Sequence, residues 1–226
     1  MGKGVSSAGG GVRDNTAWDR GRKQDGFMAH TDADEIRKQV GNEAWEKRLS
    51  DAQKEALDTY INKGYAFEDI NGVLRDPSRG ADLETWKMIK DLGRALDDSY
   101  LKENVVLLRR SDASLVNGAD SAAEVRRMYG EVVTDPGFMS ASAKVDFRAY
   151  GSTRDVEYHI KVRGGQKGVG AYVQSFADES NKGEYEFLFN RGSSFRILGA
   201  YETYGKLHVN MEYVGRTGNG NGKRKR

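Results

Sequence analysis

The chain has 226 residues and a net charge of +2, so its charge gives no strong case for a nucleic-acid-binding surface. It contains no cysteine, which excludes a disulfide framework, a thiolate zinc site and a cysteine nucleophile. Three histidines argue against a His-rich metal site. The mean hydropathy of −0.75 is typical of a soluble protein, and the absence of an apolar run of about 18 residues predicts no membrane span.

The two ends of the chain differ from its middle. Residues 1–30 are rich in glycine, serine and charge and predict a flexible arm, and residues 215–226 predict a flexible basic tail. The ends carry net charges of +2 and +5, which leaves −5 on residues 31–214, the segment that we expect to fold. The tail could contact nucleic acid or an acidic protein, or it could only aid solubility. No apolar segment follows Lys3, so we expect no secretory signal and a cytoplasmic site of action.

Residues 31–100 predict helices. Ser50 and Gln53 have the spacing of a capping box, which predicts the start of a helix. Gly64 is a candidate for the end of this helix. A later amphipathic run gathers five apolar side chains on one side, which are Leu83, Trp86, Ile89, Leu92 and Leu96.

Residues 101–214 predict short strands separated by glycine turns, with one helix near 121–130. The strands expected here cover residues 105–108, 156–162, 171–173, 184–189, 195–198 and 206–214. Few helices separate them, which disfavours a parallel doubly wound sheet. We therefore predict an α+β domain with helices first and an antiparallel or mixed sheet after them.

Three sequence features could carry chemistry. Arg109 and Arg110 end the apolar run at 105–108, where guanidinium groups could clamp a pyrophosphate or form a structural ion pair. Ser140 and Ser142 are two residues apart, so both hydroxyls would face one side of a strand and could orient a carboxylate, or simply face solvent.

The third feature is the pair Glu184 and Glu186. Two carboxylates at positions i and i+2 of a strand point the same way, and carboxylates stabilise the oxocarbenium-like state of N-glycosidic cleavage. In isolation the pair would more often be the solvated face of an amphipathic strand.

In this order, the three features resemble the R-S-E class of ADP-ribosyltransferases, above all the enzymatic components of clostridial binary toxins. Further matches are YINKGY at 60–65 followed by Asn71 and Leu74-Arg75, GFMSAS at 137–142, VRGGQKGVGAYVQSF at 162–176 and EYEFLF at 184–189. The likeness covers about 150 residues, with Ala141 where the family usually has threonine. It implies a split, mostly antiparallel β-sandwich core around an NAD cleft.

The resemblance implies a role for each matching residue. Glu186 would bond the nicotinamide ribose and stabilise the oxocarbenium ion, and Ser140 would position Glu186. Glu184 would orient the attacking group, and glutamate at this position marks enzymes that modify arginine. Arg109 would clamp NAD⁺, with Arg110 assisting on phosphate.

Other residues match the family less directly. Tyr60 and Tyr65 would lie near the NAD pocket, although packing in the core explains Tyr60 equally well. Residues 178–183 would form a substrate-recognising turn, and Tyr150 and Arg154 align only loosely with a loop near NAD⁺.

The resemblance thus implies a mono-ADP-ribosyltransferase that uses NAD⁺ as its substrate, needs no metal and modifies arginine of a target protein. A toxin or a phage-type effector would fit such a chain. Two alternatives remain open, namely an NAD glycohydrolase with little acceptor specificity and a non-catalytic interaction domain with the same fold.

Overall fold

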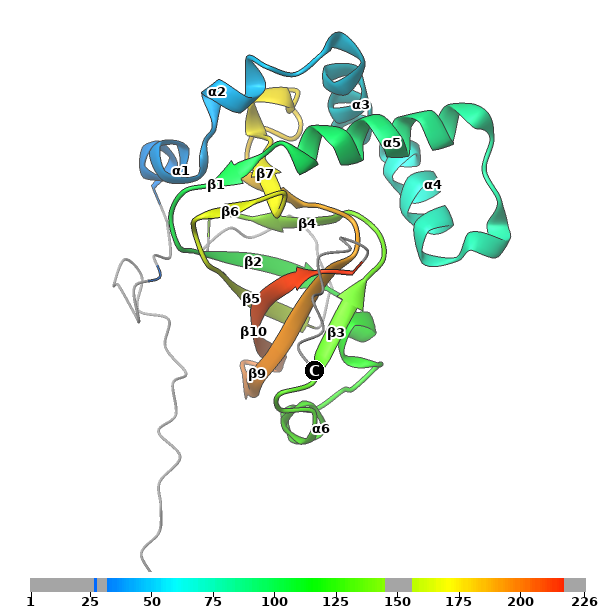
Figure 1. Ribbon diagram of the computed structural model, residues 1–226. Coiled ribbons are helices and arrows are strands. Elements are labelled where there is room, and N and C mark those ends of the chain that lie inside the picture. The colour runs from blue at the N-terminus through cyan, green and yellow to red at the C-terminus, as the bar shows by residue number, and fades with distance from the viewer. Residues whose placement is uncertain (1–26, 28–31, 145–155, 218–226) are drawn as a thin grey trace, which may run out of the picture.

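A computed structural model describes residues 27, 32–144 and 156–217. Five α-helices come first, with a short 3₁₀ turn, η1 (Pro77–Arg79), before the fifth, and they lie together at one end of the molecule (Figure 1). They are α1 (Ala33–Val40), α2 (Glu43–Glu46), α3 (Asp51–Asn62), α4 (Gly64–Arg75) and α5 (Leu83–Asp97). A short helix, α6 (Ala122–Arg127), lies at the opposite end, close to β9.

The strands follow the helices and form one large sheet with the order β3-β9-β10-β5-β2-β4-β8-β7. Their bounds are β2 (Val105–Ser111), β3 (Val132–Asp135), β4 (Met139–Ser142), β5 (Val156–Val162), β7 (Gly170–Tyr172), β8 (Glu186–Phe189), β9 (Ser193–Thr203) and β10 (Lys206–Arg216). A separate two-stranded ribbon pairs β1 (Tyr100–Leu101) with β6 (Gln166–Lys167). All neighbours are antiparallel except β5 and β10, which confirms the predicted α+β fold with N-terminal helices and a mostly antiparallel β core.

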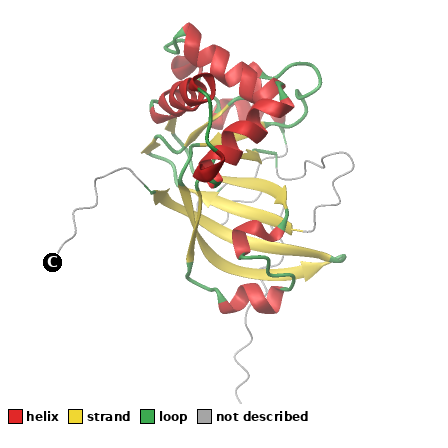
Figure 2. Ribbon diagram, turned by 90° about the vertical axis from the view of Figure 1, so that its right-hand side faces the viewer, coloured by secondary structure: helices red, strands yellow, loops and turns green. Residues whose placement is uncertain are grey.

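The sheet is divided at the junction of β2 and β4. A single register pair, Leu108 with Ser142, joins these strands, whereas β2 pairs with β5 over seven residues. One hydrophobic core lies between the two halves and includes Tyr158, Phe187 and Phe195. The second core joins the helices to the other face of β7 and β8, through residues such as Leu92, Ala171 and Leu188. In the rotated view of Figure 2, the helices lie together at one end of the strands. Alternation explains this division, because Phe187 and Phe189 enter the first core and Leu188 enters the second.

The helical layer follows the sequence pattern with two exceptions. The capping box at Ser50 is confirmed, because its hydroxyl accepts from the Gln53 amide and the Gln53 side chain accepts from the Ser50 amide. The expected end at Gly64 is wrong, since α3 ends at Asn62 and Gly64 begins α4.

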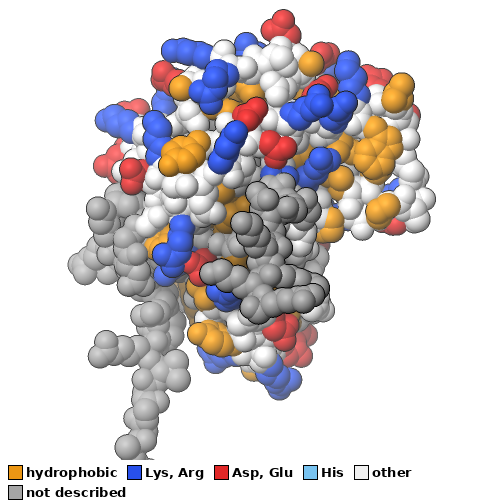
Figure 3. Space-filling view, viewed as in Figure 1, with side chains coloured by type: hydrophobic (Ala, Val, Ile, Leu, Met, Phe, Trp, Pro, Cys, Tyr) orange, Lys and Arg blue, Asp and Glu red, His pale blue; other side chains and the backbone are white. Residues whose placement is uncertain are grey.

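The first turn of α5 is the other exception. Ile89, Leu92 and Leu96 are buried as expected, but Leu83 is 86% exposed and Trp86 is 46% exposed. The first turn of α5 is therefore not covered by the residues that bury the rest of this helix. Figure 3 shows hydrophobic side chains at this outer end of the helical layer, among mixed charges.

Helix α4 is fixed to the turn between β3 and β4 by two side chains. The Asn71 amide donates to the Tyr60 hydroxyl at 2.8 Å, and its oxygen accepts from the Phe138 amide at 2.8 Å. Arg75 forms two hydrogen bonds, of 3.0 and 2.8 Å, with the carboxylate of Asp135. Because Asn71 and Asp135 are buried, these bonds hold the helices in one position over β4.

The predicted segment boundaries differ slightly from the observed elements. Phe27, inside the expected arm, is buried beneath Lys161 and Arg163. Strand β10 continues to Arg216, whose guanidinium bonds Asp97, so the first two residues of the expected tail lie in the sheet. The other residues of the arm and most of the tail lie outside the described residues.

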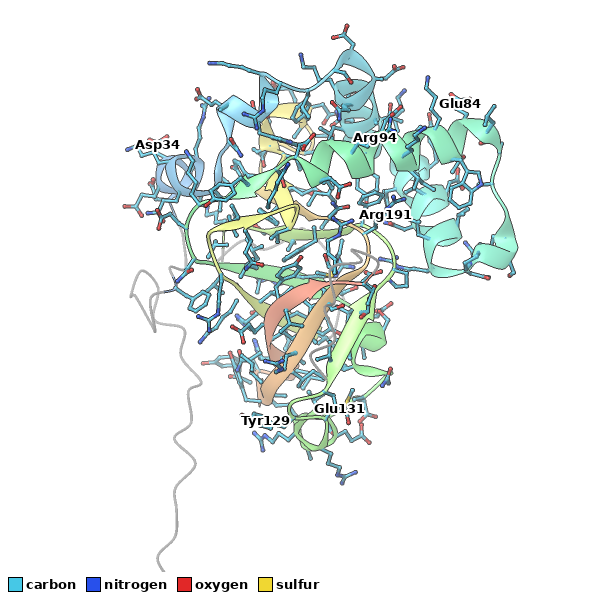
Figure 4. The ribbon with its side chains drawn as sticks, viewed as in Figure 1. Asp34, Glu84, Arg94, Tyr129, Glu131 and Arg191 are labelled. Carbon is cyan, nitrogen blue, oxygen red and sulfur yellow. The ribbon has the colours of Figure 1, made fainter. Side chains whose placement is uncertain are left out.

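Figure 4 shows how the helical layer meets the sheet. Arg191 lies beneath α5, where its guanidinium packs against Gly93, while Tyr129 and Glu131 lie at the opposite end of the molecule. None of the helices in the described part of the chain is both long and apolar enough to span a membrane.

Gly170→Ala should destabilise the protein strongly. Gly170 has a φ of 154°, and a Cβ there would meet the Leu188 carbonyl and lie 2.8 Å from the Cα of Phe189. We expect the free energy of unfolding, measured in urea, to fall by about 3 kcal/mol. Gly183→Ala is the matched control, because a Cβ there meets nothing within 4 Å, and its effect should stay within about 0.5 kcal/mol. Equal losses in the two variants would contradict this account of β7.

Candidate active site

Glu186 is the first residue of β8 and lies on the face that the sheet presents to the helices. The register pairs it with Ser142 and pairs Leu188 with Ser140, so these four side chains share one face. Glu186 is 9% exposed. Burial raises the pKa of Glu186 to about 7, with a further rise from the Glu184 carboxylate. The Ser140 hydroxyl and the Arg109 guanidinium act in the opposite direction.

Ser140 contacts Glu186 directly. Its side chain forms a hydrogen bond with the Glu186 carboxylate across the β4–β8 pair. A hydroxyl donor fixes a carboxylate in one orientation and favours its ionised form. The expected contact between these two side chains is therefore present in the structure.

Arg109 approaches the same group from β2. Its Nη1 donates to the Ser140 carbonyl at 2.7 Å, and its Nη2 donates to the Ser111 hydroxyl at 3.3 Å. Its positive charge also lowers the pKa of Glu186. The structure thus brings Arg109, Ser140 and Glu186 together from three strands.

Arg110 lies on the opposite face of β2. Adjacent residues of a strand point to opposite sides, and the Arg110 Nε donates to the Glu157 carboxylate at 2.8 Å. This ion pair is the structural alternative that the sequence left open for an arginine at the end of this strand. A role of Arg110 on phosphate stays a prediction.

Glu184 lies outside the strand, which corrects the expectation of an i, i+2 pair on one strand. Tyr185 has a φ of 52°, in the left-handed region, so β8 begins only at Glu186. Glu184 is exposed while Glu186 is buried. The carboxylates are still close enough for Glu184 to raise the pKa of Glu186.

Ser142 holds the backbone of this bend. Its hydroxyl donates to the Glu184 carbonyl at 2.8 Å and accepts from the Lys144 amide at 3.1 Å. The two serines of the motif thus have different partners: Ser140 bonds the carboxylate of Glu186, and Ser142 bonds the main chain at Glu184.

The turn at residues 178–183 is attached to the end of α3. Asn62 accepts from the Asp178 amide at 2.9 Å, and the Asn181 side chain donates to the Ile61 carbonyl at 3.2 Å. Gln174 is nearby, and its side-chain oxygen accepts from the Glu186 amide at 3.3 Å. The segment that leads into Glu184 and Glu186 is therefore supported by the helical layer.

Tyr60 and Tyr65 have different surroundings. Tyr60 is buried against Phe138, its hydroxyl bonds Asn71, and burial raises its pKa well above the usual range. The charges of Glu186 and Arg109 also affect the pKa of Tyr60, so this residue lies near the site as well as in the core. Tyr65 is 66% exposed and lines a groove of about 410 Å³ between α3, α4 and α5. Tyr150 and Arg154 lie outside the described residues.

Sequence reasoning assigned no role to Asn71 or Gln174, and it gave Ser142 only the possibility, shared with Ser140, of orienting a carboxylate. Asn71 was visible only as part of the helical motif, because its partners are 11 and 67 residues away in the chain. Gln174 lies inside the matched segment 162–176, but that match gave it no role. Ser142 was singled out for its spacing from Ser140, but its partner could not be read from that spacing.

Comparison with known proteins identifies the family. The model of the ADP-ribosyltransferase exoenzyme family matches residues 38–217. A search of curated protein sequences gave no match.

Three solved structures illustrate the structural likeness. Plx2a, an ADP-ribosyltransferase toxin from Paenibacillus larvae, has a TM-score of 0.71 at 19% identity, over 84% of this chain and 100% of that one. C3stau2 from S. aureus, solved with NAD, has a TM-score of 0.64 at 16% identity, over 84% and 99% of the two chains. The enzymatic component C2-I of the Clostridium botulinum C2 toxin has a TM-score of 0.67 at 17% identity, over 84% of this chain and 48% of that one.

These structures share the fold, and the family model covers most of the chain, including every strand from β1 to β10. The expected resemblance to this class is confirmed. The chain belongs to the ADP-ribosyltransferase exoenzyme family, whose substrate is NAD⁺.

Proposed function

We propose that the protein is a mono-ADP-ribosyltransferase that transfers ADP-ribose from NAD⁺ to an arginine of a target protein and releases nicotinamide. The observation that carries the proposal is the buried Glu186 carboxylate, bonded by Ser140 beside the Arg109 guanidinium. The exposed Glu184, two residues upstream, adds the second carboxylate. Because similar structures belong to toxins, we further propose that the protein acts as a toxin or a delivered effector in a cytoplasm.

The reaction breaks the bond between C1′ of the ribose and the nicotinamide nitrogen. Nicotinamide leaves with the electron pair of this bond, which neutralises its ring charge, so no acid is needed. The Glu186 carboxylate stabilises the resulting cation at C1′. Arg109 holds the pyrophosphate of NAD⁺.

The acceptor completes the reaction. A guanidinium nitrogen of the target attacks C1′ and passes its proton to Glu184 or to solvent. An exposed carboxylate can reach a group on another protein, which a buried one cannot. This difference in burial supports separate roles for the two glutamates.

Glu186→Gln should abolish transfer. The amide keeps the shape of the side chain but lacks the negative charge that stabilises the cation, so we expect a loss of at least about 100-fold in kcat/KM. The measurement is transfer of labelled ADP-ribose to proteins of a cell lysate, with retained folding checked by circular dichroism. Unchanged labelling by this variant would sink the proposed role of Glu186.

Glu184→Gln separates transfer from hydrolysis. If Glu184 acts only on the acceptor, the variant should lose labelling of arginine while it still releases nicotinamide from NAD⁺. Mass spectrometry of labelled lysate proteins identifies the target and the acceptor residue. A wild-type protein that releases nicotinamide but labels nothing would instead indicate an NAD glycohydrolase.

The pKa of Glu186 predicts opposite effects of pH on activity and on stability. Only the ionised carboxylate stabilises the cation, so kcat/KM should rise as pH increases through about 7. The same ionisation places a negative charge on the buried Glu186, and this charge lowers the stability of the folded state. The folded-state pKa lies above the ordinary value of 4.5, so the folded state binds more protons between these values, and stability falls as pH rises from 4.5 to 7.

Glu186→Gln removes this loss of stability. Above pH 7 the variant should be more stable than the wild type by on the order of 3 kcal/mol, and the difference should vanish near pH 4.5. Urea unfolding of both proteins across this pH range measures it. A difference that does not change with pH would contradict the raised pKa.

A further inference from the structure

Two of the three histidines converge on one carboxylate, on the face of the sheet opposite to Arg109. His159 and Glu157 lie on β5, and His208 lies on β10, which runs beside it in parallel (Figure 1). The side chains of Glu157 and His159 are 12% and 8% exposed, and that of His208 is 10% exposed. The sequence, with only three histidines, gave no reason to expect such a cluster.

Three potential ligand atoms of the cluster form a nearly equilateral triangle. The His159 Nε2 lies 3.2 Å from the His208 Nδ1 and 3.2 Å from the Glu157 Oε1. The His208 Nδ1 lies 3.4 Å from the same oxygen. Zinc bonds to histidine nitrogen and carboxylate oxygen are about 2.0–2.2 Å long, so neighbouring ligands of a tetrahedral zinc ion lie about 3.3 Å apart. The triangle therefore has the dimensions of one face of that tetrahedron.

Protons alone do not satisfy this triangle. A carboxylate oxygen brings no proton, and each ring nitrogen brings at most one, so at most two of the three edges can be hydrogen bonds. If both nitrogens donate to Glu157, their two N–H groups face each other across the third edge. A cation at the centre accepts a lone pair from all three atoms at once.

The surroundings suit a metal ligand set. Arg110 bonds the Oε2 of Glu157 at 2.8 Å, which fixes the carboxylate and leaves Oε1 directed at the histidines. The ring of Tyr201 stacks on His208, with centroids 4.6 Å apart and planes 2° apart, and this contact restrains the imidazole. A hydrogen bond to the second oxygen of a ligating carboxylate, as from Arg110 to Glu157, is typical of metal sites.

The charge beside the three ligand atoms affects how tightly a cation binds. The Nε of Arg110 lies 2.8 Å from the Oε2 of Glu157. The positive charge of Arg110 lowers the affinity for a cation, so we expect moderate rather than very tight binding.

We propose that Glu157, His159 and His208 form a structural zinc site that joins β5 to β10, with its fourth position available to water or another ligand. The proposed transfer reaction takes place on the other side of β2. Arg109 points toward Ser140 on that side, whereas Arg110 points toward Glu157 and the proposed metal site. The expected effect of the metal is therefore on stability.

Zinc binding tests the proposal directly. The full chain is stripped with a chelator, dialysed against micromolar free Zn²⁺ and analysed for bound metal. We expect about one zinc per chain and a rise of several degrees in the thermal midpoint. His208→Gln should weaken binding by more than about 100-fold and remove the thermal shift, because loss of a ligand costs more than loss of a supporting contact.

The remaining histidine gives a matched control. His30→Gln makes the same chemical change in the one histidine that is not a proposed ligand, and it should leave zinc binding and the thermal shift intact. No bound zinc on the wild type, or equal binding by the His208→Gln and wild-type proteins, would overturn the proposal.

A measurement on the wild type keeps the test decisive if His208→Gln does not fold. Cobalt(II) in a tetrahedral site absorbs visible light far more strongly than octahedral cobalt(II). We expect the Co²⁺-loaded protein to show the intense tetrahedral spectrum and to lose it when Zn²⁺ is added. A weak octahedral spectrum, or none, would overturn the site.

Discussion

The arrangement of the candidate active site depends on the burial of one carboxylate. Glu186 is 9% exposed at the start of β8, where desolvation disfavours its charged form. A buried carboxylate persists only where donors and positive charge compensate for lost water. Ser140 supplies the donor from β4, and Arg109 supplies the charge from β2. The positions of three strands are thus fixed relative to a single side chain.

The division of the sheet makes this convergence possible. Because β2 and β4 share only the pair Leu108–Ser142, the Ser140 carbonyl has no ladder partner from β2. The Arg109 guanidinium bonds this carbonyl in place of a strand. The second core, with the Asn71 and Arg75 bonds of α4, then holds the helices against β4. The Asn71 bond lies near the site because Phe138, whose amide donates to Asn71, directly precedes β4, the strand that carries Ser140.

The sequence predicted the elements better than their relations. Periodicity predicted many of the helices and strands and the fold class. The family motif predicted a contact between Ser140 and Glu186, which the structure contains. The left-handed Tyr185 has no local signal, so Glu184 was assigned to the strand. Amphipathicity indicated which face of α5 is apolar but not how much of that face is covered, so it grouped the exposed Leu83 with the buried Ile89 and Leu92. The pairing of β5 with β10 joins His159 to His208 across 49 residues, which no local pattern reveals.

The adjacent residues Arg109 and Arg110 connect two different sites through one strand. Alternation directs Arg109 toward Ser140 and Glu186 and directs Arg110 toward Glu157, so neither guanidinium can substitute for the other. A shift of β2 by one residue would exchange the two faces and separate both carboxylates from their arginines. The pairing of β2 with β5 over seven residues opposes such a shift. The seven-residue pairing with β5 therefore holds β2 in register even though β2 and β4 share only one pair. That short pairing is what divides the sheet next to Glu186.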